Sequence, residues 1–376
     1  MKINKISKSH KWNRYPAFYN LNVMYNEIHP TCETSTINRD LGEDYFVDSY
    51  YGRVYDRSYY NNVAIYGRSQ NMDYYINSVD LDIVDELRVP FRKVPVFSVS
   101  NIEQVHSVIE KVKLENEGYE ILLRGQTKPY FIDREPEEQE LFYGECDIKE
   151  PSFMPSHLRH DFDEVFLESM WHSQVSMLFN DVGYQYQGKL SQQELQLYLK
   201  DTNYIRHTHL VTPFSLGIAQ HYGMPSVGLD LTDNLIVANW FASNHMNIGD
   251  DGLTTTTKVD SSSHLTSMIY IFRCPKNTVF DYKVVKPKVF PNSRPDAQNA
   301  WFGHVGWGEA TNQLGGYLVC AFKLTESYLN SLPEGLEEGF FPKMEDDPIL
   351  QFFMRKRNNP HYEGDAKKAL RNIYHL

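Results

Sequence analysis

The sequence predicts an α+β fold, with a mixed, mainly antiparallel sheet core and helices packed around it. Segments with helical spacing and segments with strand character follow each other without strict β-α-β alternation, which favours α+β over a parallel sheet. Two continuous apolar runs, 267–273 and 316–324, predict buried strands. Apolar residues make up 41% of the 376 residues, and 26 Tyr and 21 Phe supply much of the burial. The chain therefore has enough apolar side chains for a sizeable core.

The first part of the chain, 1–96, is a small Tyr-rich N-terminal extension that carries 12 of the 26 tyrosines. Within it, 51–70 alternates loosely and contains an Asn-Asn turn candidate, which predicts β-hairpins packed on the core. The aromatic surface has two interpretations: the half-buried face of a small sheet, or a surface that binds a protein partner. The predicted organisation is this extension, a main domain over 97–330 and a helical C-terminal segment over 331–376.

Cap and breaker residues mark the first elements of the main domain. Ser100 and Glu103 form a capping-box pattern before apolar residues at helical spacing, and Gly118 marks the end of that helix. The following run, 119–125, predicts a strand that ends on Arg124-Gly125.

Further helix starts follow. Asp161 is a cap candidate for a helix, and Ser191 with Glu194 forms a second capping-box pattern. Thr212 precedes a proline, which predicts a helix that stops at Gly223.

The last third combines short strands, a polar loop and two helices. The run 226–231 predicts a strand, and Thr232 or Asp233 is the cap candidate of the next helix. The polar stretch 249–266 predicts a long mobile loop. Helical segments are expected at about 347–356 and 365–374.

Charge and composition exclude some classes of function. The net charge is −12, and 1–97 carries equal numbers of acidic and basic residues, so the acidic excess lies downstream. Nucleic-acid binding is therefore not expected, since it depends on Lys and Arg. The four widely spaced cysteines indicate free thiols in a reducing compartment. The chain shows no signal-peptide pattern and no run long enough to span a membrane, so we expect a cytoplasmic protein with no membrane contact.

Two groups of residues are candidates for chemistry. The first is Arg124-Gly125-Gln126 at a strand end, where a guanidinium can hold a phosphate or carboxylate and Gln126 offers both a donor and an acceptor. The second lies in 219–242, where a helix end, a strand and a helix start follow within about a dozen residues. Its polar members are Gln220, His221, Tyr222, Asp230, Thr232 and Asp233.

These polar residues leave two interpretations open. They line a cleft, since Asp230 and Thr232 share one side of a strand. Alternatively they are structural: Asp230 bonds backbone amides, Thr232 caps a helix, and His221 satisfies a helix end.

The ordered motifs resemble those of the FRG domain family, which is named for a Phe-Arg-Gly motif. The matching stretches are Arg124-Gly125-Gln126, "EPSFMPSHLRH" at 150–160, "AQHYGMPSVGLDLTDNLIVANWFA" at 219–242 and Gln313-Leu314-Gly315 before a strand, and the match covers about 97–330. Family members are bacterial and phage-encoded, and some are associated with defence or toxin systems. The chain departs from the family pattern at Leu123, Ser226-Val227 and Leu231, where the family has Phe, Thr-Arg and Trp.

The motif order is also similar, more distantly, to that of ADP-ribosyltransferases, which implies a split sheet and NAD as substrate. The resemblance places Arg124 on the pyrophosphate and Thr232 in the nicotinamide-ribose pocket. A carboxylate, Glu309 or Asp230, would stabilise the positive charge that forms as the glycosidic bond breaks. The implied catalytic residues are Asp230, His221 and Glu309. The implied ligand-binding residues are Arg124, Gln126, Gln220, Tyr222, Thr232, Asp233 and Gln313.

Three functions follow as hypotheses. The first is an NAD-using enzyme of the ADP-ribosyltransferase or NAD glycohydrolase type, and the second is a non-catalytic interaction module that uses the same polar motif structurally. A nuclease-like toxin is the third, weakened by the acidic balance. No metal is expected, because His157 and His160 lie near a helix start where such residues also cap.

Overall fold

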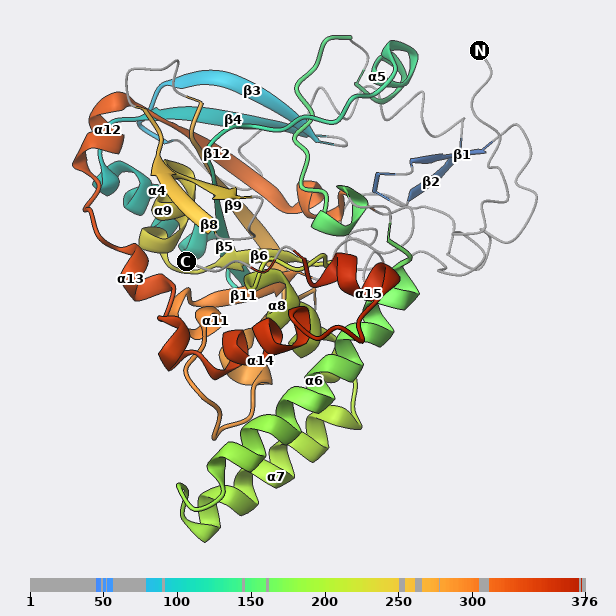
Figure 1. The fold of residues 1–376 in the computed structure, drawn as a ribbon. Helices are drawn as coiled ribbons and strands as arrows, with labels where there is room; N and C mark the ends of the chain where they lie inside the picture. The colour runs from blue at the N-terminus through green and yellow to red at the C-terminus, as the bar shows by residue number, and fades with distance from the viewer. Residues whose placement is uncertain are drawn as a thin grey trace. The chain divides into compact units, whose positions relative to one another are not determined.

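The computed structural model describes residues 45–48, 50–51, 53–56, 79–89, 92–143, 146–159, 162–249, 254–260, 266–276, 278–303, 311–371 and 373. The contacts within the chain divide it into two compact units. Figure 1 shows the helices and strands of both units as a ribbon. The first unit comprises Met1–Met154, Asp260–Thr278 and Val305–Leu332. The second comprises Pro155–Val259, Val279–His304 and Pro333–Leu376.

The first unit is built on strands that pair in the order β5-β9-β12-β4-β3. All of these pairs are antiparallel except β12 with β4, which is parallel. The prediction of a mixed, mainly antiparallel α+β core is therefore confirmed. The strands are β3 (Ile83–Val89), β4 (Arg92–Val99), β5 (Tyr119–Gln126), β9 (Met268–Pro275) and β12 (Leu318–Leu324).

Helix α4 (Ile102–Glu115) packs on β4 and β5 because its apolar residues recur on one face. The buried members of that face are Val105, Val108, Ile109 and Val112. The remaining elements of this unit are β1 (Tyr45–Asp48), β2 (Arg53–Asp56), α5 (Pro136–Tyr143), η4 (Gln313–Tyr317) and α12 (Glu326–Ser331).

The second unit contains a helical hairpin, α6 (Glu164–Tyr186) and α7 (Gln192–Arg206), drawn in green in Figure 1. Helix α8 (Val211–His221) packs on α6, and so does α14 (Pro348–Arg357) from the end of the chain. The C-terminal part also contains α13 (Glu337–Phe340), η5 (Met344–Asp346) and α15 (Gly364–Ala369).

Short strands of the second unit pair antiparallel in the order β6-β11-β10. Their bounds are Leu229–Thr232 for β6, Ala300–Gly303 for β11 and Val279–Asp281 for β10. Helix α9 (Leu235–Ser243) follows β6, and its Val237 and Trp240 pack with Phe340 and Phe341 from the C-terminal part. The unit also contains η3 (Ser156–Arg159), α10 (Tyr282–Val285) and α11 (Arg294–Ala297).

Several predicted helix caps are wrong by one or two residues. The side chains that cap α4, α6 and α9 are Asn101, Asp163 and Asn234. They replace the predicted Ser100, Asp161, and Thr232 or Asp233. Each observed cap carries a side-chain oxygen that accepts from a backbone N–H two or three residues on.

Thr212 is not a cap either, because α8 starts one residue earlier and the Thr212 hydroxyl bonds Glu168. The capping box of Ser191 and Glu194 is confirmed, and so is the end of α8 at Gly223, which has a φ of 82°.

The predicted loop over 249–266 is wrong in part. Residues Thr254–Lys258 form β8, which pairs antiparallel with β7 (Asn244–Ile248). Four consecutive threonines read as low complexity, but threonine is β-branched and fits a strand that has a partner.

The N-terminal extension is described only in part. A hairpin exists at β1 and β2, with Asp48 opposite Arg53, while 57–78 lies outside the described residues. The predicted domain limits at 96 and 330 stay a prediction. None of the described helices is long and apolar enough to cross a membrane.

Gly228, just before β6, is a position where the fold leaves no room for a side chain. A Cβ there would lie 1.8 Å from Cε2 and 2.2 Å from Cζ of Phe302, a buried ring on β11. We expect Gly228→Ala to lower the free energy of unfolding by about 1–3 kcal/mol through overpacking. Gly339→Ala is the control, because a Cβ at Gly339 meets no atom within 4 Å. Equal stability of the two variants in urea denaturation would contradict this packing.

Candidate functional site

The first candidate group lies at the end of β5 in the first unit. Arg124 and Gln126 share one face of the strand because side chains alternate along it. Arg124 lies opposite Tyr270 of β9 in the register, so the two side chains are on the same face. Burial raises the pKa of the Tyr270 phenol, and the nearby positive charge of Arg124 opposes this shift. The guanidinium therefore lies close to a buried phenol rather than on an isolated strand end.

The second motif, 150–160, contributes to the same face through Phe153. The Phe153 ring meets the rings of Tyr270 and Phe272 edge-on, each at 5.0 Å between centroids. A buried ion pair holds the start of the 150–160 segment. Arg134 Nε lies 2.5 Å from Glu150 Oε2. The motif thus covers the sheet beside Arg124.

Asn312 links this segment to the predicted residue Gln313. Its side-chain oxygen accepts from the Phe153 N–H at 2.6 Å, and its amide nitrogen donates to the Pro151 carbonyl at 3.0 Å. Gln313 follows directly and begins η4, which contacts β9. Arg124, Gln126, Tyr270 and Phe153, with Gln313 of η4 as the expected further member, are called the first-unit motif face below.

Two amide groups of this face carry buried atoms without a hydrogen-bond partner among the described residues. These atoms are Gln126 Oε1, an acceptor, and Gln313 Nε2, a donor. Gln313 itself is only 3% exposed. Buried polar atoms of this kind are rare in folded proteins, so each needs an explanation, and a ligand that supplies the missing bonds is one.

The second candidate group lies in the second unit, and its members form hydrogen bonds with one another and with other residues of that unit. Gln220, near the end of α8, donates from Nε2 to Oδ1 of Asp230 on β6 at 2.7 Å. Both residues are half-buried. Asp230 and Thr232 both belong to β6 and are two residues apart, so their side chains share one face of the strand, as predicted. Val227, where the resembled family has Arg, is completely buried and packs as an apolar residue.

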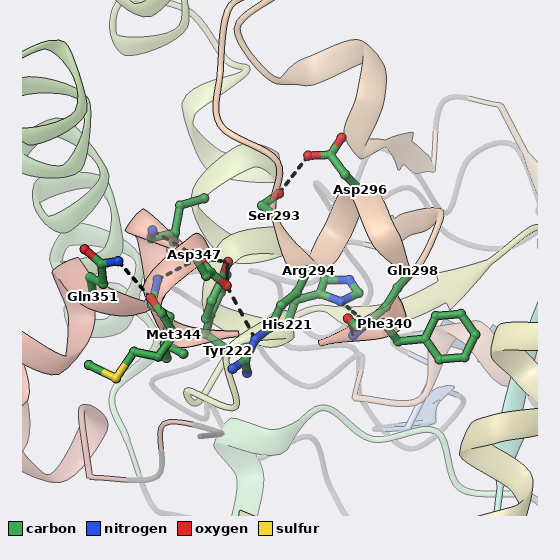
Figure 2. Close-up of polar contacts among 12 residues, drawn as sticks. His221, Tyr222, Ser293, Arg294, Asp296, Gln298, Phe340, Met344, Asp347 and Gln351 are labelled. Carbon is green, nitrogen blue, oxygen red and sulfur yellow. Dashed lines mark hydrogen bonds and ion pairs between the residues drawn. The ribbon is translucent and has the colours of Figure 1, made fainter. Parts of the chain in front are cut away.

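His221 is held by Gln298, as Figure 2 shows. The imidazole Nδ1 lies 2.8 Å from the Gln298 side-chain oxygen, and the Gln298 amide donates to the Phe340 carbonyl at 3.1 Å. The Thr232 hydroxyl donates to the Gln298 backbone carbonyl at 2.9 Å. One residue therefore joins the end of α8, the end of β6 and the C-terminal part.

Tyr222 forms the centre of a second buried group in Figure 2. Its hydroxyl donates to the Asp347 carboxylate, 2.9 Å from Oδ1 and 2.8 Å from Oδ2. Arg294 Nε lies 3.7 Å from Asp347 Oδ2, and the Arg294 guanidinium lies over the Tyr222 ring at 4.8 Å. The side chains of Arg294 and Asp347 are both 0% exposed.

Burial sets the protonation of this group. It raises the pKa of the Asp347 carboxyl, while the backbone N–H of Leu350 and the charge of Arg294 oppose the rise. It also raises the pKa of the Tyr222 phenol, helped by the negative charge of Asp347. Tyr222 therefore stays a neutral donor, as a structural hydrogen bond requires.

The structure thus places the predicted site residues in two groups. Arg124, Gln126 and Gln313 belong to the first unit, while Gln220, His221, Tyr222, Asp230 and Thr232 belong to the second. Asp233 is exposed, and Glu309 lies outside the described residues. That all of them bind one ligand stays a prediction.

Sequence reasoning missed several partners of these residues. They are Gln298, Arg294 and Asp347, and sequence reasoning also missed Asn312, which holds the Phe153 segment beside Gln313. Only Asp347 had a local signal, because an acidic residue followed by Pro348 is a typical cap with proline at the first helical position. The others pair across long stretches of chain.

The described residues contain no group of three or more His, Cys, Asp or Glu side chains that could hold a metal ion. His157 is buried, with Nδ1 3.2 Å from the Ser226 carbonyl. His160 and Asp161 lie outside the described residues. Comparison of the chain with models of known families, with curated proteins and with solved structures gave no significant match.

Proposed function

We propose that this protein binds a nucleotide, NAD in particular, at the first-unit motif face. The observation that carries the proposal is the combination of a strand-end guanidinium with a buried acceptor, Gln126 Oε1, and a buried donor, Gln313 Nε2, that lack partners among the described residues. An unsatisfied buried polar atom costs about 1–3 kcal/mol. A ligand with an anionic group and an amide or base edge would remove that cost.

The chemistry of NAD suits these groups. Arg124 would hold the pyrophosphate bidentately, and the two glutamines would bond the carboxamide or the adenine edge. In the proposed reaction the bond between nicotinamide and ribose breaks, and nicotinamide leaves with the bonding electron pair. Water or an acceptor group then bonds the ribose carbon and gives up a proton, and a carboxylate, with Glu309 as the candidate, would stabilise the charge that forms and take that proton. An ADP-ribosyltransferase-like split sheet and a role in bacterial defence or as a toxin belong to this proposal.

Isothermal titration of NAD, ADP-ribose and ATP into the full chain tests the proposal. We expect Arg124→Ala to weaken binding of NAD by about tenfold to a hundredfold, because a charge-assisted bond contributes roughly 1.5–3 kcal/mol. The melting temperature should change little, since Arg124 is half-buried at a strand end.

Arg273→Ala is the matched control for this titration. Arg273 lies on the neighbouring strand β9 and is also half-buried, but the register puts it opposite Ile121, on the other face of the sheet. Its guanidinium stacks on Tyr119 at 4.0 Å. Binding that is lost equally in both variants, or absent from the wild type for every nucleotide, would overturn the proposal.

A second candidate function, a non-catalytic interaction module, is favoured by the second unit. His221, Tyr222 and Thr232 all bond other described residues, as expected of side chains with a structural role. A protein partner of the Tyr-rich N-terminal extension belongs to this candidate. The same titration separates the two functions, because the module binds none of the three nucleotides.

A further inference from the structure

Two tyrosines at the tip of the N-terminal hairpin bond Asn312, the residue before Gln313 of the candidate ligand site. Tyr50 and Tyr51 lie in the connection between β1 and β2. The Asn312 backbone N–H donates to the Tyr50 carbonyl at 2.6 Å, and the Asn312 side chain donates to the Tyr51 hydroxyl at 3.0 Å. Tyr51 is 0% exposed. The extension is thus fastened to the residue that precedes Gln313.

Asn312 forms hydrogen bonds with several segments that are far apart in sequence. Besides the two tyrosines, it accepts from the Phe153 N–H and donates to the Pro151 carbonyl. Its carbonyl accepts from the Gly315 N–H at 3.1 Å, which closes the first turn of η4. Through Asn312, the position of Tyr51 therefore bears on both Phe153 and η4.

Tyr51 approaches η4 so closely at Gly315 that a side chain there would displace the Tyr51 hydroxyl or the Asn312 amide. A Cβ at Gly315 would lie 2.9 Å from the Tyr51 hydroxyl and 2.9 Å from Asn312 Nδ2. The tyrosines also contact the buried Arg134, whose guanidinium lies 4.7 Å from the Tyr50 ring centre and 6.0 Å from that of Tyr51. Arg134 in turn pairs with Glu150, at the start of the segment that carries Phe153.

We infer that Tyr51 is a positioning residue of the candidate ligand site, which acts through Asn312 to hold Gln313 and Phe153 in place. The inference rests on the proposed function for its effect on binding. The structural part of the inference is that Tyr51, through Asn312, holds Phe153 and η4 in place. This set of bonds is called the clamp below, and it is tested without any ligand. The hairpin that carries Tyr51 then has a role in the site of the first unit.

Tyr51→Phe removes the hydroxyl and keeps the ring, so it is the variant of choice. Tyr198→Phe in α7 is the matched control. Tyr198 is also 0% exposed, and its hydroxyl donates to the Phe179 carbonyl at 2.6 Å, in the second unit. Both variants lose one buried hydrogen bond, so a similar fall in melting temperature is expected of both.

The first measurement is amide hydrogen exchange of the full chain without ligand. Tyr51→Phe should speed exchange at Phe153 and Gly315, whose N–H groups bond Asn312, while Tyr198→Phe should leave both unchanged. The second is titration with NAD, where Tyr51→Phe should raise the Kd about fivefold, as expected for one lost hydrogen bond. Tyr198→Phe should keep the wild-type Kd.

The outcomes separate the two claims. Unchanged exchange at Phe153 and Gly315 in Tyr51→Phe overturns the clamp, whatever the chain binds. Faster exchange with an unchanged Kd overturns the positioning role. A wild type that binds no nucleotide, together with faster exchange in Tyr51→Phe, refutes the proposed function and supports the clamp.

Discussion

Asp347→Ala is expected to lower the free energy of unfolding of the second unit by about 3–5 kcal/mol, the usual loss when one partner of a buried ion pair is removed. Asp347 accepts from the Tyr222 hydroxyl and from the backbone N–H groups of Ile349 and Leu350 at the start of α14. Its removal leaves the charge of Arg294 buried without this carboxylate. Urea denaturation measures the loss in free energy of unfolding. Amide hydrogen exchange in α8 and α14 shows whether the loss lies in these helices.

The control for this prediction is Asp365→Ala. Asp347 is the N-cap of α14, and Asp365 is likewise an acidic residue near the start of a C-terminal helix. Asp365 pairs with Lys368 at 3.1 Å, but its side chain is 58% exposed. An exposed pair contributes at most about 1 kcal/mol. If the two variants were equally stable, the buried group around Tyr222 would not hold the C-terminal part on α8.

Glu150→Ala is expected to destabilise the first unit by a similar amount, about 3–5 kcal/mol. The Arg134 and Glu150 side chains are 2% and 1% exposed, and two bonds join them, from Nε at 2.5 Å and from Nη2 at 3.0 Å. Because Glu150 starts the segment with Phe153, exchange should rise first at Ser152 and Phe153. The ion pair of motif 150–160 is therefore expected to be structural.

Asp85→Ala is the control for Glu150→Ala in the same unit. Asp85 pairs at 2.5 Å with Lys149, the residue before Glu150, but both side chains are at least 40% exposed. We expect a loss below about 1 kcal/mol. A loss as large as that of Glu150→Ala would mean that burial does not decide the strength of these pairs.

The regular elements follow from local patterns, and the sequence predicts them well. The strand at 119–125 and the apolar strands at 267–273 and 316–324 all exist, with bounds shifted by up to two residues. Each is a continuous apolar run next to a breaker or cap, so its state is set by nearby residues. The polar strand β8 was missed because its stability depends on pairing with β7, a tertiary effect.

The sequence motifs suggest which residues belong to the candidate site, and this stays a prediction, but they did not predict the hydrogen bonds around these residues. Motif order identified Arg124, Gln126, Gln313 and the 220–232 region. It did not show that Tyr222 bonds Asp347, 125 residues away, or that Asn312 bonds Tyr51, 261 residues away. Such pairs leave no periodic signal in one sequence, since only the folded chain brings the partners together.

The most direct test of the nucleotide site is amide exchange of the wild-type chain with and without saturating NAD. The proposal requires protection at the end of β5, over residues 125–127, and in η4, with no change in α14. Protection confined to other elements, or no protection at a concentration that saturates a measured binding curve, would contradict a ligand site at the first-unit motif face.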